Sequence, residues 1–298
     1  MSGKLILRVA AAASLTCVAA GAANAAVTLY GLTSAQSGRN LVSFNSDTPG
    51  SFTSNIAITG DVMRGVDLFA LDLNSSNNTP YSIGSLGGGD YALYAIGYDG
   101  VATRIGANLG VNIGTENAGL DYDAAANLFR VVTNDDRVFS IDPTTGLASA
   151  GQDFGYAAGD ALGANNPNVV AAGYADRLYV LDRNGPGNAG ILSTLDGTTL
   201  NSVAALDRQI NANASFDIAG NGEAYFNDGR VADRLYQLDL ATGTTVDKGA
   251  LELRLTGLTA GPGATAAVPE PASWAMMIGG FALVGFAIRR RSPRRLHA

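Results

Sequence analysis

The sequence predicts an all-β fold, a β-propeller closed by strands from both ends of the body. Between residues 26 and 260, short apolar runs rich in Val, Ile, Leu and Tyr alternate with turns of Gly, Asn, Asp and Thr, and no helical period is sustained. One strand-and-turn pattern recurs at intervals of 40 to 57 residues. This interval is typical of a four-stranded propeller blade.

Residues 1–25 have the pattern of a signal peptide. Lys4 and Arg8 precede an apolar stretch, and Ala23-Asn24-Ala25 fits the small-x-small cleavage pattern. We therefore expect export through the Sec translocon and signal-peptidase cleavage after Ala25. The single cysteine, Cys17, lies in this segment. The mature chain is thus predicted to have neither disulfides nor thiolate chemistry.

The repeated pattern is an apolar strand that ends in Asp or Asn and a turn that closes on Gly. Its five copies are marked by Leu41, Leu93, Val138, Leu178 and Leu235. We expect each copy to form the third strand of a blade and its exit turn, in which the Asp side chain accepts backbone amides and Gly takes a positive φ. The last three copies begin with Asp-Arg, and each Arg is expected to contact a carboxylate of the neighbouring blade.

A second group of strands reads as the innermost strand of each blade. Three copies begin at Arg64, Ala118 and Ala214, and a fourth, at Leu255, lies at the end of the body. If residues 253–260 supply an inner strand and residues 27–59 supply three outer strands, the ring closes without free edges. These copies favour five blades. Six blades stay open, because residues 153–168 and 193–213 show no clear pattern.

The charge of the body excludes nucleic acid as a partner. Residues 26–268 contain 12 basic and 25 acidic residues, a net charge of −13. Such a body repels phosphate backbones. No cofactor is indicated, although an acidic surface could collect a divalent cation.

Carboxylates are the candidate catalytic groups, because the single histidine, His297, lies in the C-terminal tail. Asp67, Asp121 and Asp217 occupy matching positions in three inner-strand copies. If they point into the channel, two of them could serve as the acid and base of glycoside cleavage. A residue repeated in several blades is more typical of a structural hydrogen bond, and a cation site is the third alternative.

The C-terminal residues 269–298 form a second targeting segment, after a short linker at residues 261–268. Pro269-Glu270-Pro271 precedes an apolar run at residues 272–288, which is long enough for a single transmembrane helix of about 25 Å. Arg289, Arg290 and Arg291 begin the basic tail at residues 289–298 and should stay cytoplasmic, which places the body across the membrane. This arrangement resembles the PEP-CTERM sorting signal of Gram-negative bacteria. The resemblance implies recognition by an exosortase-type processing enzyme and delivery to the cell surface or the extracellular space.

The body resembles the DUF4394 family of exported bacterial proteins. The similarity is carried by three stretches, Gly119–Gly146, Asn166–Asp182 and Ser215–Phe226, and covers residues 26–260. That family has no assigned chemistry, so the resemblance implies only a propeller-like fold. We expect a non-enzymatic structural or glycan- or protein-binding propeller, with extracellular polysaccharide or a surface protein as partner. The alternative is a carboxylate-dependent hydrolase or lyase acting on extracellular polysaccharide.

Replacing Pro269-Glu270-Pro271 with three alanines should block processing, because it removes the tripeptide while leaving the apolar run that holds the chain in the membrane. Immunoblots of membrane and culture fractions should show a full-size precursor in the inner membrane. Mature protein of normal size from the variant would contradict the assignment.

Overall fold

The computed structural model describes residues 26–34, 38–63, 65–114 and 117–262. The signal peptide and the C-terminal targeting segment predicted above lie outside these residues. In the described part of the chain, no helix is long and apolar enough to cross a membrane. That part consists of strands and one short 3-10 helix, η2 (Pro186–Asn188).

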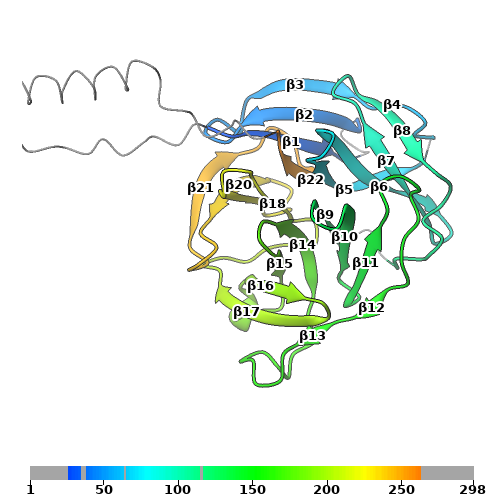
Figure 1. Ribbon diagram of the computed structural model, residues 1–298. Helices are drawn as coiled ribbons and strands as arrows, with labels where there is room; N and C mark the ends of the chain where they lie inside the picture. Colours follow the sequence, from blue (N-terminus) through cyan, green and yellow to red (C-terminus); the bar gives the residue numbers. More distant parts are fainter. Residues whose placement is uncertain (1–25, 35–37, 64, 115–116, 263–298) are drawn as a thin grey trace, which may run out of the picture.

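The strands form five antiparallel sheets arranged around one axis, so the five-bladed propeller is confirmed (Figure 1). Blade 1 runs outward as β22 (Leu255–Ala260), β1 (Thr28–Thr33), β2 (Asn40–Asn45) and β3 (Phe52–Ala57). Blade 2 contains β5 (Asp67–Asn74), β6 (Thr79–Gly87), β7 (Asp90–Ile96) and β8 (Val101–Ile105). Blade 3 contains β9 (Ala118–Asp123), β10 (Leu128–Thr133), β11 (Arg137–Ile141) and β12 (Gln152–Asp153).

The last two blades complete the ring. Blade 4 contains β14 (Val169–Tyr174), β15 (Leu178–Asp182), β16 (Ile191–Asp196) and β17 (Thr199–Ala205). Blade 5 contains β18 (Ser215–Ile218), β19 (Ala224–Asn227), β20 (Arg234–Leu238) and β21 (Thr245–Ala250). The first strand of every blade lies next to the central axis and contacts the first strands of both neighbouring blades.

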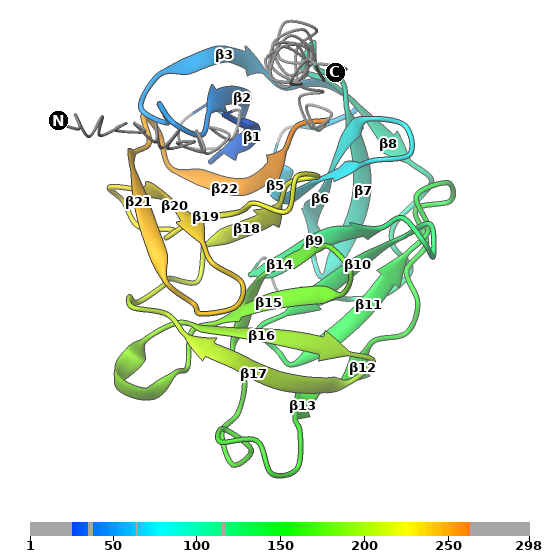
Figure 2. The ribbon, with the colours of Figure 1, turned by 60° about the vertical axis from the view of Figure 1, so that its left-hand side comes forward.

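Blade 1 is assembled from both ends of the body, as predicted. The C-terminal strand β22 pairs antiparallel with β1, and Gly31 lies opposite Leu258 (Figure 2). The outer strands β2 and β3 follow β1 in the chain. The last strand of the body therefore joins the first strands and closes the ring of five blades.

Two connecting segments extend the outer edges of blades 2 and 4. The short strand β4 (Thr59–Gly60) leaves blade 1 and pairs in parallel with β8, and β13 (Gly155–Tyr156) leaves blade 3 and pairs in parallel with β17. The second of these segments accounts for part of the stretch in which the sequence showed no pattern. It belongs to a connection between blades and not to a sixth blade.

The repeat positions are mostly as predicted, with one correction. β2, β7, β11 and β20 are third strands, but the copy at Leu178 forms β15, the second strand of blade 4. The pattern is not specific for the third strand because it describes only an apolar strand followed by an Asx turn. The turns themselves have the expected chemistry. Asp142 Oδ1 accepts the backbone N–H of Thr144 at 2.7 Å, and Gly146 has a φ of 69°.

The arginines of the Asp-Arg steps do not join blades, which corrects a second expectation. Arg137 pairs with Asp153, directly opposite it on β12, and Arg234 pairs with Asp247 on β21. Arg177 pairs with its neighbour Asp176. The partners of Arg137 and Arg234 are cross-strand neighbours in the same sheet, and the partner of Arg177 is its neighbour in the chain.

Apolar side chains fill the spaces between neighbouring blades, and close approach of the inner strands needs small residues. A side chain on Gly119 in β9 would place its Cβ 2.6 Å from the carbonyl carbon of Ala171 and 2.7 Å from the Cβ of Ala172 in β14. Blades 3 and 4 therefore meet backbone to backbone at this point. Such overpacking costs about 1–3 kcal/mol when the backbone has to shift.

Gly119→Ala should lower the free energy of unfolding by about 1–3 kcal/mol, because the added methyl group separates the two inner strands. Chemical denaturation monitored by circular dichroism measures the change. Gly155→Ala is the matched control, since nothing lies within 4 Å of a Cβ at that position. Equal stability of the two variants would contradict the close packing of β9 on β14.

Candidate functional site

Three buried aspartates meet at the end of the channel where the inner strands have their carboxyl ends. They are Asp72 in β5, Asp121 in β9 and Asp217 in β18. One oxygen of each carboxylate lies within 4.8 Å of the others. We call this end of the propeller the carboxyl-end face.

Each of these carboxylates accepts a hydrogen bond from the inner strand of the next blade. Tyr122 N donates to Asp72 Oδ2 at 2.7 Å, and Tyr174 N donates to Asp121 Oδ2 at 2.8 Å. The contact repeats at equivalent positions of the inner strands. On each donor strand, the N–H belongs to the residue directly after the one that occupies the aspartate position. The aspartates therefore join blade 2 to blade 3 and blade 3 to blade 4.

The ring continues through blade 1 with a threonine. Ala260 N donates to Asp217 Oδ2 at 2.5 Å, and Leu73 N donates to Thr259 Oγ1 at 3.1 Å. The Thr259 hydroxyl also lies 3.1 Å from Asp72 Oδ1 and 2.9 Å from Asp217 Oδ2. Thr259 thus takes the aspartate's place on β22 and links the first and last blades.

Blade 4 lacks this contact because Gly173 stands at the equivalent position. A Cβ there would lie 2.8 Å from the ring of Phe216, so no longer side chain fits. The N–H of Ile218, which such a side chain would have bound, donates instead to Asp217 Oδ1 at 2.5 Å. Four of the five blade junctions therefore carry the same side-chain-to-backbone bond.

Asp121 and Asp217 come together as the sequence predicts, but Asp67 does not join them. Asp67 is exposed at the beginning of β5 and lines a separate hollow at the opposite end of the channel, with Asn213 and Arg254. Asp67 is the first residue of β5, and Asp72, further along the same strand, takes the matching position. A β-bulge at Ala70, where φ is 51°, lies between them. The segment Ala70-Leu71-Asp72-Leu73 also fits the inner-strand pattern, so this signal was present in the sequence.

The three carboxylates are electrostatically frustrated. Burial raises the pKa of Asp72, Asp121 and Asp217, and repulsion from Asp217 raises that of Asp72 further. Asp72 and Asp217 raise the pKa of Asp121 in the same way. Groups this close release their protons as one coupled unit, so a negative charge on one carboxylate disfavours ionisation of the others. They are also the described residues that could hold a divalent cation, which stays a prediction.

A cavity of about 710 Å³ opens above the carboxylates, and the channel closes below them. No lysine or arginine is among the described residues that line this cavity. Beneath the carboxylates, Leu71, Leu120, Phe216 and Leu258 leave a space of only about 10 Å³. The cavity is therefore blind, and its floor is formed by the ring of hydrogen bonds.

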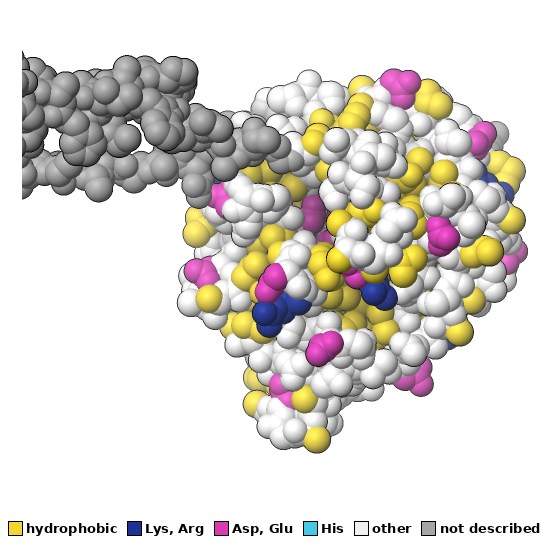
Figure 3. Space-filling model, in the orientation of Figure 1, with side chains coloured by type: hydrophobic (Ala, Val, Ile, Leu, Met, Phe, Trp, Pro, Cys, Tyr) yellow, Lys and Arg dark blue, Asp and Glu magenta, His cyan; other side chains and the backbone are white. Residues whose placement is uncertain are grey.

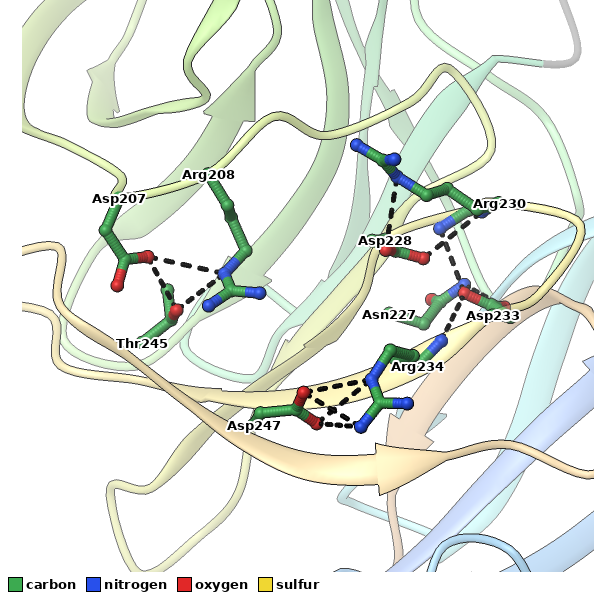
Figure 4. A network of polar contacts seen from close by, with 10 residues as sticks. Asp207, Arg208, Asn227, Asp228, Arg230, Asp233, Arg234, Thr245 and Asp247 are labelled. Atoms are coloured by element: carbon green, nitrogen blue, oxygen red, sulfur yellow. Dashed lines mark hydrogen bonds and ion pairs between the residues drawn. The ribbon is translucent and has the colours of Figure 1, made fainter.

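A second polar network holds blade 5 against blade 1 at the other end of the inner strands (Figure 4). Asp233 accepts the side-chain amide of Asn227 at 2.7 Å and the backbone N–H of Leu255 at 3.1 Å. Burial, together with the carboxylate of Asp228, raises the pKa of Asp233 to about 7. Arg230 pairs with Asp228 at 3.3 Å. These contacts fix the loop between β19 and β20 onto the closing strand.

The raised pKa values of the three ring aspartates predict a contribution to stability that falls as the pH rises above about 4, because the folded state retains protons that these aspartates release on unfolding. Aspartates with a lowered pKa, such as Asp247, contribute in the opposite sense. Asp121→Asn should flatten this slope and exceed the wild type in stability at about pH 8. Asp121→Ala leaves Tyr174 N without its acceptor and should cost about 1–3 kcal/mol. Urea denaturation in EDTA at a series of pH values measures both effects.

Asp67→Asn is the control for this series, because it changes an aspartate outside the ring. It should keep the wild-type pH profile. A wild-type profile for Asp121→Asn as well would show that the carboxylates do not repel one another.

Two family models match the chain. The model of a domain of unknown function, DUF4394, matches residues 40–259, and the PEP-CTERM protein-sorting motif matches residues 267–291. The chain matches no curated protein.

Several solved structures match the chain at low sequence identity. A Bacteroides caccae protein of unknown function is 12% identical, with a TM-score of 0.45, over 80% of this chain and 99% of that one. A Lactobacillus plantarum protein is 15% identical, with a TM-score of 0.42, over 76% and 67%. A Xanthomonas campestris protein described as a gluconolactonase is 12% identical, with a TM-score of 0.43, over 80% and 85%. These similarities carry no argument about the chemistry of this chain, whereas the family models cover most of its length. The chain belongs to the DUF4394 family and ends in a PEP-CTERM sorting motif.

Proposed function

We propose that this chain is a non-catalytic propeller that binds extracellular polysaccharide through its carboxyl-end face. The proposal rests on the use of the channel carboxylates. Asp72, Asp121 and Asp217 each accept a backbone N–H of the next blade. A general acid and a nucleophile or base need oxygens that face the substrate and change their protonation during the reaction. Loss of these hydrogen bonds in each turnover would loosen the ring.

The location follows from the two ends of the chain. The sorting motif implies an exported protein recognised by an exosortase-type system. We infer further that signal peptidase cleaves after Ala25, that residues 272–288 anchor the precursor in the inner membrane, and that the processed body acts at the cell surface or in the extracellular matrix. Polysaccharide is the abundant polymer in that setting, and a net charge of −13 keeps the body soluble there.

A polysaccharide hydrolase or lyase is the second candidate. It is favoured by one observation, the raised pKa of buried carboxylates at the floor of an open cavity. Protonated carboxyl groups at neutral pH are typical of general acids. Asp121 would then be essential for turnover, and its role in joining blades would be secondary.

The two candidates are separated by one experiment on the full chain, purified in detergent. Exopolysaccharide isolated from the producing bacterium is the probe, and both sedimentation with the polymer and release of reducing or unsaturated ends are measured. We expect binding without release of new ends, and unchanged binding by Asp121→Asn. Release of ends that disappears in Asp121→Asn would establish the enzyme, and absence of binding by the wild type would overturn the binding proposal.

A further inference from the structure

A second cavity opens on the carboxyl-end face between blades 3 and 4. Its volume is about 510 Å³, within the range of pockets that hold small ligands. Tyr174, at the end of β14, lines both this cavity and the central one. Figure 3 shows acidic and basic side chains around the middle of the ring, with hydrophobic side chains between them. We call this second cavity the interblade pocket.

Arg130 is held in a fixed orientation at one wall of the interblade pocket. Its Nε and Nη2 donate to Asp123 Oδ2 at 3.4 and 3.1 Å, and its Nη1 donates to Ser140 Oγ at 2.6 Å. A guanidinium group has five N–H donors. Among the described residues, three of these donors have acceptors, and one N–H remains on each terminal nitrogen. Two N–H groups of this held guanidinium thus have no acceptor among the described residues.

The other walls combine apolar and polar groups. Val138, Leu178 and Leu195 are buried and form an apolar lining. Thr194 and Asn201, on β16 and β17, add a hydroxyl and an amide from blade 4. A lining that combines an apolar patch with several hydrogen-bonding groups suits a ligand with one apolar face and polar edges. A sugar ring has this character, because its C–H groups and its hydroxyls lie on different sides.

The charges of the pocket favour an uncharged ligand. Arg130 is paired with Asp123, and Arg177 is paired with Asp176 at 2.8 Å. Asp196 adds a further carboxylate to the lining, so the pocket is slightly negative within a strongly acidic body. A polyanionic polymer would be repelled from such a surface, whereas a neutral saccharide would not.

We propose that the interblade pocket is the saccharide-binding site and that it takes an uncharged sugar unit of a polysaccharide. This inference rests on the proposed function and adds the place and the class of ligand. The two remaining N–H groups of Arg130 bind adjacent ring hydroxyls, and Asn201 and Asp196 bind hydroxyls on the opposite edge. Leu178 and Tyr174 contact the apolar face of the ring. The central cavity then has no part in recognition.

The test measures binding of the purified full chain to the producing bacterium's exopolysaccharide, to neutral dextran and mannan fragments, and to a polyuronate. Arg130→Lys keeps the positive charge beside Asp123 but removes the planar arrangement of guanidinium N–H donors. It should raise the Kd about tenfold, because one charge-assisted hydrogen bond to the ligand is lost. Arg177→Ala and Asn201→Trp change exposed residues of the lining and should also weaken binding. Arg234→Ala is the matched control, an exposed arginine paired with Asp247 on blade 5.

Each outcome decides a different point. The site is supported if the wild type binds a neutral saccharide and salt does not change this binding. The three pocket variants should lose the binding, and Arg234→Ala should keep it. Binding that all three pocket variants retain overturns the site but leaves the proposed function standing. Binding only to the polyuronate, with a steep loss in salt, overturns the uncharged ligand. No saccharide binding by the wild type overturns the proposed function and this inference with it. Circular dichroism of each variant verifies the fold.

Discussion

The propeller depends on one repeated interaction, the hydrogen bond from the N–H of an inner strand to the side chain of the inner strand before it. Asp72, Asp121, Asp217 and Thr259 make this bond at four of the five blade junctions. Apolar contacts between blades are strong but do not fix how far one blade slides along another. A directional bond at the same level of each inner strand sets that register. It also brings three carboxylates close together at the axis.

This closeness limits what the channel can do. Buried carboxylates repel one another, and only amide N–H groups and the Thr259 hydroxyl compensate their charge. The three carboxylates can share protons while they keep their hydrogen bonds to the backbone. A substrate would need the same oxygens and would compete with these hydrogen bonds. Function is therefore expected above the ring and beside it, where side chains are not required for closure. The interblade pocket meets this condition, since Arg130 and Arg177 are bound only within their own blades.

Family membership and structure contribute different parts of this picture. The DUF4394 match covers most of the body, and the PEP-CTERM match accounts for the end of the chain. Neither assigns chemistry. The inference about the saccharide site comes from the geometry of the interblade pocket and from the charge of its lining.

Local patterns in the sequence were sufficient for the all-β class, the closure of blade 1 by β22 and the Asx turns such as the one at Asp142. They favoured five blades over six, and the structure decided that number. These features depend on residues close together in the chain, or on repeats that can be compared directly. The signal peptide predicted at residues 1–25 and the sorting motif at residues 267–291 are equally local patterns. Only the tertiary structure decided which aspartates meet and where a ligand could bind. The placement of β5 against β9 puts Asp72 and not Asp67 in the ring, and the pocket arises where blades 3 and 4 pack. Register and interblade packing depend on contacts between strands far apart in the sequence.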